Sequence, residues 1–263
     1  MIKLVVTDVD GTLVGDGKMQ LNPEYFDVIR ALVDKGIHVV MASGRTYDSI
    51  REIIEPVKDL VWYISDSGCT IKTDHGFEST SELPHDLLRE FIKDVRKVPG
   101  LSYFLSDTQY SYLPEKDTLM YNSLTYQYHY NTVYVENLDE VPNGPYSKIT
   151  LFRETDIEAY ANEYLTNKWS KVFNMAKSGT CWIDCTMPGI NKASALQVIM
   201  ERLGVSREEV MATGDNQNDI EMIQYAGVGL GVASAHPDLK AVANAIIPSY
   251  KEDGVLQEWK KLL

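Results

Sequence analysis

The sequence predicts an α/β fold, in which a core built on a parallel sheet carries an inserted α+β unit. Four short apolar runs end in small polar or acidic residues, and helical patterns follow three of them. These runs span residues 4–6, 37–42, 60–64 and 210–212. From residue 82 to residue 187, strand-like runs and helices occur without regular alternation, as in α+β units. We therefore expect a core of residues 1–81 and 188–263 and an inserted unit of residues 82–187.

Helix signals follow the first strands of the predicted core. Asn22 is a suitable N-cap, and Pro23 a suitable first residue, for a helix that ends at Gly36. A second helix is expected to open at Thr46 and to stop before Pro56. Each helix therefore lies between two of the predicted strands.

A third core helix is expected to open at Asn191, with Lys192 in its first turn. The helix dipole disfavours a cation at this place by up to about 1 kcal/mol. Lys192 therefore either has a separate role or is a solvated lysine, and the sequence leaves both interpretations open. Residues 228–247 predict two more strand-and-helix units that complete the sheet.

The segment from residue 70 to residue 187 predicts short strands and helices that do not alternate regularly. Residues 70–80 predict a polar hairpin with His75 and Gly76 at its turn, followed by a helix that opens at residues 81–84. One further helix is expected near residues 155–168. Short strands are expected near residues 101–105, 109–113, 132–135, 147–152, 171–174 and 181–186.

Tyrosines are concentrated in the inserted unit, where half of the sixteen lie between Tyr103 and Tyr134. Tyr126, Tyr128 and Tyr130 alternate as residues on one face of a strand do. We favour sheet packing or a contact between two copies of the chain over a substrate-facing role, because aromatic residues populate cores and interfaces first.

Acidic and polar residues follow the core strands at their carboxyl ends. If these strands are parallel neighbours, Asp8, Asp10, Ser43, Asp215 and Asp219 share one rim, where ligands bind in open parallel sheets. Two carboxylates about 4 Å apart repel by on the order of 4 kcal/mol at an effective dielectric constant near 20. A cation is therefore needed, and oxygen ligands without nearby Cys or His indicate Mg²⁺.

Composition narrows the classes of partner. The formal net charge of −13 argues against nucleic acid and anionic membrane surfaces, and no apolar run approaches membrane-spanning length. Cys69, Cys181 and Cys185 lack a zinc-binding pattern and are expected to be free thiols. Few residues precede the first motif, so no signal peptide is expected. We expect a cytoplasmic protein that is a monomer or a homodimer.

Four motifs in this order resemble those of the haloacid dehalogenase-like superfamily of phosphohydrolases. They are Asp8-Val9-Asp10-Gly11-Thr12-Leu13, Ser43-Gly44-Arg45, Lys192 and Gly214-Asp215-Asn216-Gln217-Asn218-Asp219. The insertion is similar to the large α/β cap of the Cof-type branch, whose members are mostly phosphatases of sugar phosphates and other small phosphate esters. The resemblance implies a Rossmann-like core, an inserted cap that sets specificity, and a small phosphorylated metabolite as substrate.

The resemblance also implies roles for matching residues. Asp8 would be the nucleophile that forms an aspartyl-phosphate, and Asp10 the acid that protonates the leaving alcohol and then activates water. Ser43 and Lys192 would bind the phosphoryl group. Mg²⁺ would be held by Asp8, Asp215 and the Asp10 main-chain carbonyl, with support from Asn218 and Asp219. Gly44, Arg45 and Asn218 are further candidates for substrate binding.

Several alternatives stay open. Arg45 either binds substrate or pairs with Asp48 or Glu52 at the start of its helix. Ser67-Gly68-Cys69 and Gly231-Val232-Ala233 depart from the Asn-Gly-Ala and Gly-Asn-Ala of many Cof-type members, which leaves hydrogen bonds near the phosphate or leaving group open. A phosphomutase with the same chemistry, or a phosphate-binding sensor without turnover, are the competing functions.

Overall fold

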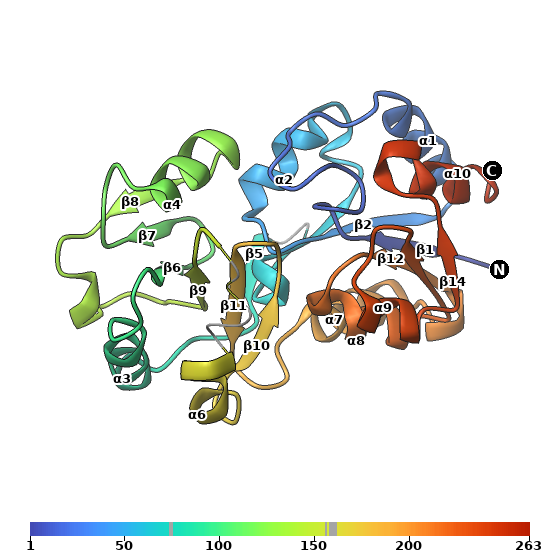
Figure 1. Cartoon of the computed structure of the whole chain (residues 1–263). Coiled ribbons are helices and arrows are strands. Elements are labelled where there is room, and N and C mark those ends of the chain that lie inside the picture. The colour runs from blue at the N-terminus through green and yellow to red at the C-terminus, as the bar shows by residue number, and fades with distance from the viewer. Residues whose placement is uncertain (74–75, 156, 158–161) are drawn as a thin grey trace.

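A computed structural model describes residues 1–73, 76–155, 157 and 162–263, whose strands form two sheets (Figure 1). The large sheet contains β1 (Leu4–Thr7), β2 (His38–Ala42), β3 (Trp62–Ser65), β4 (Thr70–Thr73), β5 (Gly76–Ser79), β12 (Val210–Gly214), β13 (Val228–Val232) and β14 (Ala245–Ile247). Across the sheet the order is β14-β13-β12-β1-β2-β3-β4-β5. The strands from β14 to β3 are parallel, and the β4–β5 hairpin adds antiparallel strands at one edge. The predicted parallel-sheet core is confirmed.

Helices cover both faces of the large sheet. They are α1 (Glu24–Asp34), α2 (Tyr47–Ile53), α7 (Lys192–Leu203), α8 (Ile220–Tyr225), α9 (Pro237–Val242) and α10 (Gly254–Lys260). Figure 1 shows α1 and α10 on one side of the strands and α7, α8 and α9 on the other. The apolar face of α1 packs into this core, and Gly36 follows the helix with a φ of +81°, a conformation that suits glycine.

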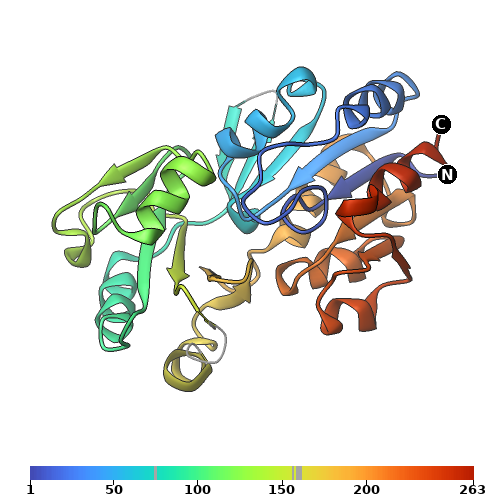
Figure 2. The same ribbon diagram turned by 45° about the horizontal axis from the view of Figure 1, so that its top comes forward.

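The small sheet lies beside the large one and is formed by the middle of the chain (Figure 2). It contains β6 (Ser102–Ser106), β7 (Ser111–Leu113), β8 (Thr132–Tyr134), β9 (Lys148–Phe152), β10 (Asn174–Lys177) and β11 (Trp182–Thr186). The order is β10-β11-β9-β6-β7-β8, and only the β7–β8 pair is parallel among these described strands. Helices α3 (His85–Val95), α4 (Leu119–Asn122) and α6 (Asn167–Trp169) accompany it. The α+β expectation is therefore confirmed.

Some expected elements lie partly outside the described residues. The helix expected near residues 155–168 is described from Asn162, as a π-helical turn over Asn162–Thr166 followed by α6. His75 also lies outside the described residues, although β4 and β5 form the expected hairpin. Among the described residues, no helix combines the length and the apolar character needed to cross a bilayer.

The strand expected near residues 171–174 was wrong, because β10 begins only at Asn174. The amide groups of Val172 and Phe173 both donate to the Trp169 carbonyl, so this segment closes the turn after α6. Phe173 is buried and its ring stacks on Trp169 at 5.9 Å. Aromatic packing against the helix outweighs the local strand pattern.

The alternating tyrosines do not form a strand, which corrects the prediction for Tyr126, Tyr128 and Tyr130. Thr118 caps α4, and Ser123–Gln127 continues it as a π-helical turn. Tyr126 is therefore 69% exposed, whereas Tyr128 and Tyr130 are buried. The capped helical turn continues through this segment, so the alternation of the tyrosines does not produce a strand.

Candidate active site

The parallel pairing of β1 with β12 brings two acidic loops to the same level. Thr7 lies opposite Thr213 in the register, so Asp8 and Asp215 follow just beyond the strand ends. Asp8, Asp215 and Asp219 each offer a carboxylate oxygen, and these oxygens lie within 4.8 Å of one another. The predicted meeting of the first acidic motif with the late one is confirmed as geometry.

Lys192 joins these carboxylates. Its Nζ lies 2.6 Å from Asp8 Oδ1 and 2.6 Å from Asp219 Oδ1, and the side chain is fully buried. Asn191 and Ser194 form a capping box at the start of α7, which fixes Lys192 in the first turn. The solvated-lysine interpretation was wrong, because two buried anions offset the unfavourable helix dipole.

The electrostatics of this cluster favour a bound cation. Burial raises the pKa of Asp8 to about 7, although Lys192 opposes the shift, and burial with repulsion from Asp8 and Asp219 raises the pKa of Asp215 well above its usual value. Burial alone would lower the pKa of Lys192, but Asp219 and Asp8 raise it.

Carboxylate oxygens of Asp8 and Asp215 remain for a ligand in this cluster. Asp8 Oδ2 is buried and accepts no hydrogen bond from the described residues, and Asp215 Oδ1 accepts only a 3.3 Å bond from Thr12 among those residues. Asp219 Oδ2, by contrast, already accepts from the main-chain amides of Asp215 and Asn216. The arrangement fits a hard divalent cation between Asp8 and Asp215, with Asp219 supporting indirectly.

The side chain of Asp10 forms an ion pair with Arg45. Arg45 Nε lies 2.6 Å from Asp10 Oδ2, its Nη2 lies 2.7 Å from Oδ1, and Gly17 donates its amide to Oδ1 at 2.9 Å. The expected alternative pairing of Arg45 with Asp48 or Glu52 was therefore wrong. The guanidinium is 1% exposed and needs a buried anion, which Asp10 supplies.

The second motif lies next to these carboxylates. Ser43 is buried and its Oγ accepts the Arg45 amide at 3.1 Å, while the Gly44 carbonyl accepts from Lys148 Nζ at 2.9 Å. Asn218 is buried too, but it lines a separate small cavity with Ser67 and others. The predicted site residues therefore lie on one group of loops, with Asn218 next to Asp219 in the turn Gln217–Asp219.

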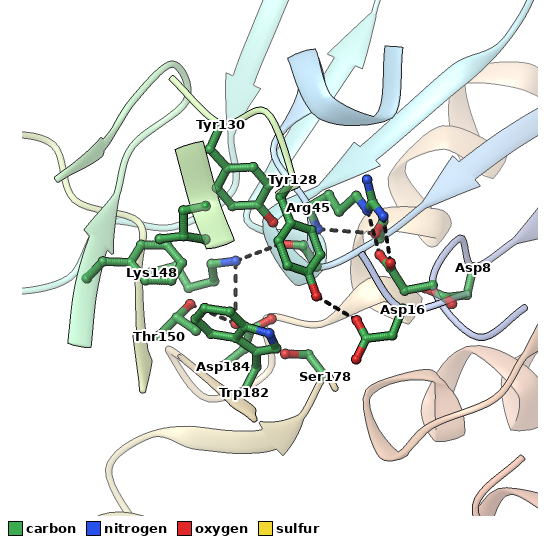
Figure 3. Close-up of a pocket in the computed structure, with 15 residues that line it drawn as sticks. Asp8, Asp16, Arg45, Tyr128, Tyr130, Lys148, Thr150, Ser178, Trp182 and Asp184 are labelled. Atoms are coloured by element: carbon green, nitrogen blue, oxygen red, sulfur yellow. Dashed lines mark hydrogen bonds and ion pairs between the residues drawn. The ribbon is translucent and has the colours of Figure 1, made fainter. Parts of the chain in front are cut away.

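A pocket joins this cluster to the small sheet (Figure 3). Its walls comprise Asp8, Asp10, Asp16, Ser43, Gly44 and Arg45 on one side, and Phe104, Leu124, Tyr128, Tyr130, Lys148, Thr150, Ser178, Trp182 and Asp184 on the other. Tyr128 and Tyr130 are buried in a hydrophobic cluster, as the preference for packing predicts, and they also line the pocket. Asp16 lies in a turn between Gly15 and Gly17.

Sequence reasoning missed the buried ion cluster that joins the two sheets. Lys148 Nζ lies 3.1 Å from Asp66 Oδ1, at the end of β3, and 3.5 Å from Asp184 Oδ1 on β11. Thr150 Oγ1 donates to Asp184 at 2.7 Å, and Ser67 Oγ donates to its other oxygen. A lysine inside an apolar strand was the available signal, since buried lysines need anionic partners.

The cluster makes Lys148→Met a test of how the sheets are joined. Removing the cation leaves Asp66 and Asp184 buried without charge compensation, so we expect a loss of about 3–5 kcal/mol of unfolding free energy. Urea unfolding followed by fluorescence would measure it. Lys240→Met, at an exposed position on α9, is the matched control and should change stability by less than about 0.5 kcal/mol. Equal effects of the two changes would contradict this account.

Comparison with known proteins gives consistent results. A model of the haloacid dehalogenase-like hydrolase family matches residues 5–258. The chain is 29% identical over 255 residues to the 5-amino-6-(5-phospho-D-ribitylamino)uracil phosphatase YcsE of Bacillus subtilis, covering 97% of this chain and 93% of that protein. It is 29% identical over 266 residues to a phosphoglycolate phosphatase of Methanoculleus marisnigri, covering 99% and 97%.

Solved structures share the whole fold. A crystal structure from Eubacterium rectale has 32% sequence identity and a TM-score of 0.85, covering 100% of this chain and 99% of that one. The HAD subclass IIB sugar phosphatase BT4131 has 23% identity and a TM-score of 0.82, covering 99% and 98%, and supports the fold alone. These matches extend over both sheets.

Proposed function

The chain belongs to the haloacid dehalogenase-like hydrolase family and is a phosphatase of that family; we propose that it hydrolyses a small phosphate monoester, such as a sugar phosphate, in a Mg²⁺-dependent reaction through an aspartyl-phosphate. The observation that carries the proposal is the cluster of Asp8, Asp215 and Asp219 around Lys192, with Asp8 Oδ2 free of hydrogen bonds from the described residues.

The proposed metal ligands are the Asp8 and Asp215 carboxylates and the Asp10 main-chain carbonyl. Bound Mg²⁺ would neutralise the crowded carboxylates and polarise the phosphoryl oxygens. Asp219 would act indirectly, because Lys192 and two main-chain amides already engage its oxygens. Asn218 would support the site from the turn Gln217–Asp219, in which it directly precedes Asp219.

The chain's own residues supply the chemical steps. An Asp8 carboxylate oxygen attacks phosphorus, the bond from phosphorus to the leaving oxygen breaks, and Asp10 gives that oxygen its proton. Water then attacks the aspartyl-phosphate, Asp10 takes a proton from it, and the bond from phosphorus to Asp8 breaks to release inorganic phosphate. In the structure, Arg45 donates two hydrogen bonds to the Asp10 carboxylate and so fixes its position.

The remaining groups position the phosphoryl oxygens and the leaving group. Ser43, beside Asp8 in the pocket wall, would donate a hydrogen bond to one phosphoryl oxygen, and Lys192 would balance its charge. Gly44 lines the pocket and would contact the substrate through its main chain. We propose that residues 82–187 act as the cap and contact the leaving group. The free thiols of Cys69, Cys181 and Cys185 are compatible with a cytoplasmic setting.

Removal of divalent cations should abolish activity. With an aryl phosphate and a panel of sugar phosphates, we expect phosphate release in Mg²⁺ and a loss of at least about 10²-fold after chelation, because the site loses its main charge stabilisation. Added Mg²⁺ should restore the rate. Full activity after exhaustive chelation would contradict the proposal. Net phosphate release excludes a phosphomutase, and repeated turnover excludes a sensor that only becomes phosphorylated.

A further inference from the structure

We propose that the pocket selects phosphate esters whose leaving group is uncharged or cationic and rich in hydroxyl or amino donors, and that Asp16 determines this specificity. A leaving group with a second anion, such as a carboxylate or another phosphate, is rejected. This inference rests on the proposed phosphatase function and deepens it by naming the class of leaving group.

Among the described residues, Arg45 has no donor left for a substrate anion. A guanidinium has five N–H donors. Two point at Asp10, one at the Lys18 carbonyl, one at Ser49 Oγ and one at Met19 Sδ. Within the described part of the chain all five are therefore engaged, and the charge of Arg45 is already balanced.

The charge of Lys148, the other cation in the pocket wall, is also balanced. Its Nζ donates to the Gly44 carbonyl at 2.9 Å and forms ion pairs with Asp66 Oδ1 at 3.1 Å and with Asp184 Oδ1 at 3.5 Å. Two carboxylates surround one ammonium, so this side of the pocket is not left positive.

Asp16 adds a carboxylate with spare capacity as an acceptor. Asp16 as a whole residue is exposed, but its carboxylate lines the pocket. There, Tyr128 Oη donates a hydrogen bond to Asp16 Oδ1 at 2.6 Å (Figure 3). Burial raises its pKa, and hydrogen bonds from Tyr128 and the Thr180 main chain lower it. A carboxylate has about four acceptor sites, so it can accept further donors from a ligand. An anion at this place is repelled by the Asp16 carboxylate.

The other walls favour a neutral molecule with flat or C–H-rich faces. Four rings form a closed cycle, in which each ring meets the next edge-on or tilted: Phe104, Trp182, Tyr128 and Tyr130. Their centroids lie 5.8–6.4 Å apart. Aromatic faces attract apolar C–H surfaces and cations and repel anions, because the ring face is negative. A polyol, sugar or amino-substituted ring fits these walls.

The test compares two substrates that differ in one group. Sorbitol 6-phosphate and 6-phosphogluconate have the same carbon chain, but the second carries a carboxylate where the first has a hydroxymethyl group. At equal ionic strength and saturating Mg²⁺, we expect kcat/KM to be at least about 10-fold higher for sorbitol 6-phosphate. The reason is repulsion between the carboxylates of Asp16 and 6-phosphogluconate inside the pocket. Equal kcat/KM values would overturn the proposal.

Asp16→Asn tests the residue itself. The substitution keeps the size of the side chain and removes its charge, so the preference for sorbitol 6-phosphate should fall at least about 5-fold. The KM for 6-phosphogluconate should decrease, while its kcat should stay the same. Asp34→Asn removes an exposed carboxylate at the end of α1 and should leave the preference unchanged. If the two variants shift the preference equally, only net charge matters and the role of Asp16 is overturned. Circular dichroism verifies that both variants fold.

Failure of this proposal is distinguishable from failure of the proposed function. An aryl phosphate, which has a neutral leaving group and no second anion, reports on the phosphatase chemistry in the same assay. No turnover of any ester in Mg²⁺ overturns the proposed function. Turnover of the aryl phosphate together with equal use of the matched pair overturns only the specificity.

Discussion

Asp8→Asn is expected to lower phosphate release from an aryl phosphate by at least about 10³-fold, because an amide oxygen is a far weaker nucleophile than a carboxylate. The change is nearly isosteric and leaves an acceptor for Lys192, which lies 2.6 Å from the present Oδ1. Steady-state assays at saturating Mg²⁺ would measure kcat and KM separately. A variant with more than about a tenth of wild-type kcat would contradict the role of Asp8 as nucleophile.

The stability of Asp8→Asn relative to the wild-type protein is expected to depend on pH. The folded-state pKa of Asp8 is raised to about 7, so its contribution to stability is full below the unfolded value near 3.8 and is lost as pH rises towards 7. Without divalent cations, Asp8→Asn should therefore gain stability relative to wild type between these values. Thermal unfolding from pH 4 to pH 8 would measure the difference. A variant that becomes relatively less stable as pH rises would contradict this reading of the site.

Lys192→Met is expected to have the second largest effect, on both activity and stability. The change leaves Asp8 and Asp219 buried without their shared cation, which should cost about 3–5 kcal/mol in unfolding free energy without metal. Turnover should fall at least about 10²-fold, since the phosphoryl charge loses its buried partner. Urea unfolding and phosphate-release assays would measure the two effects.

A matched control distinguishes the loss of a buried lysine from the loss of any lysine. Lys93→Met, at an exposed position on α3, should change stability by less than about 0.5 kcal/mol and leave kcat unchanged. Mg²⁺ should recover part of the lost stability of Lys192→Met, because it also neutralises Asp8. A fully active and stable Lys192→Met protein would contradict the assigned role of this lysine.

The sequence was sufficient for the core and for most of the acidic cluster. Apolar runs that end in Asp8 and Asp215 report both burial and the position of the strand ends, and a parallel sheet then places those ends together. The capping signal at Asn191 correctly placed Lys192 in a first helical turn. These features follow from local patterns plus one rule about sheets.

The errors arose where the partner of a side chain lies far away in the chain. Arg45 forms its ion pair with Asp10, 35 residues earlier, rather than with Asp48 or Glu52. Lys148 is held by Asp66 and Asp184, which no local pattern connects. The tyrosines failed for another reason, because a capped helical turn overrode their alternation. Burial that depends on long-range packing is not encoded in short-range periodicity.

The contacts between the two sheets are polar at the places nearest the pocket. Lys148, Asp66, Asp184 and Ser67 meet there, and Tyr128 reaches Asp16. Charged and hydroxyl groups form hydrogen bonds with water when they separate, whereas exposure of apolar surface to water is unfavourable. Separation of the two sheets at this boundary would therefore expose polar groups to water rather than apolar surface.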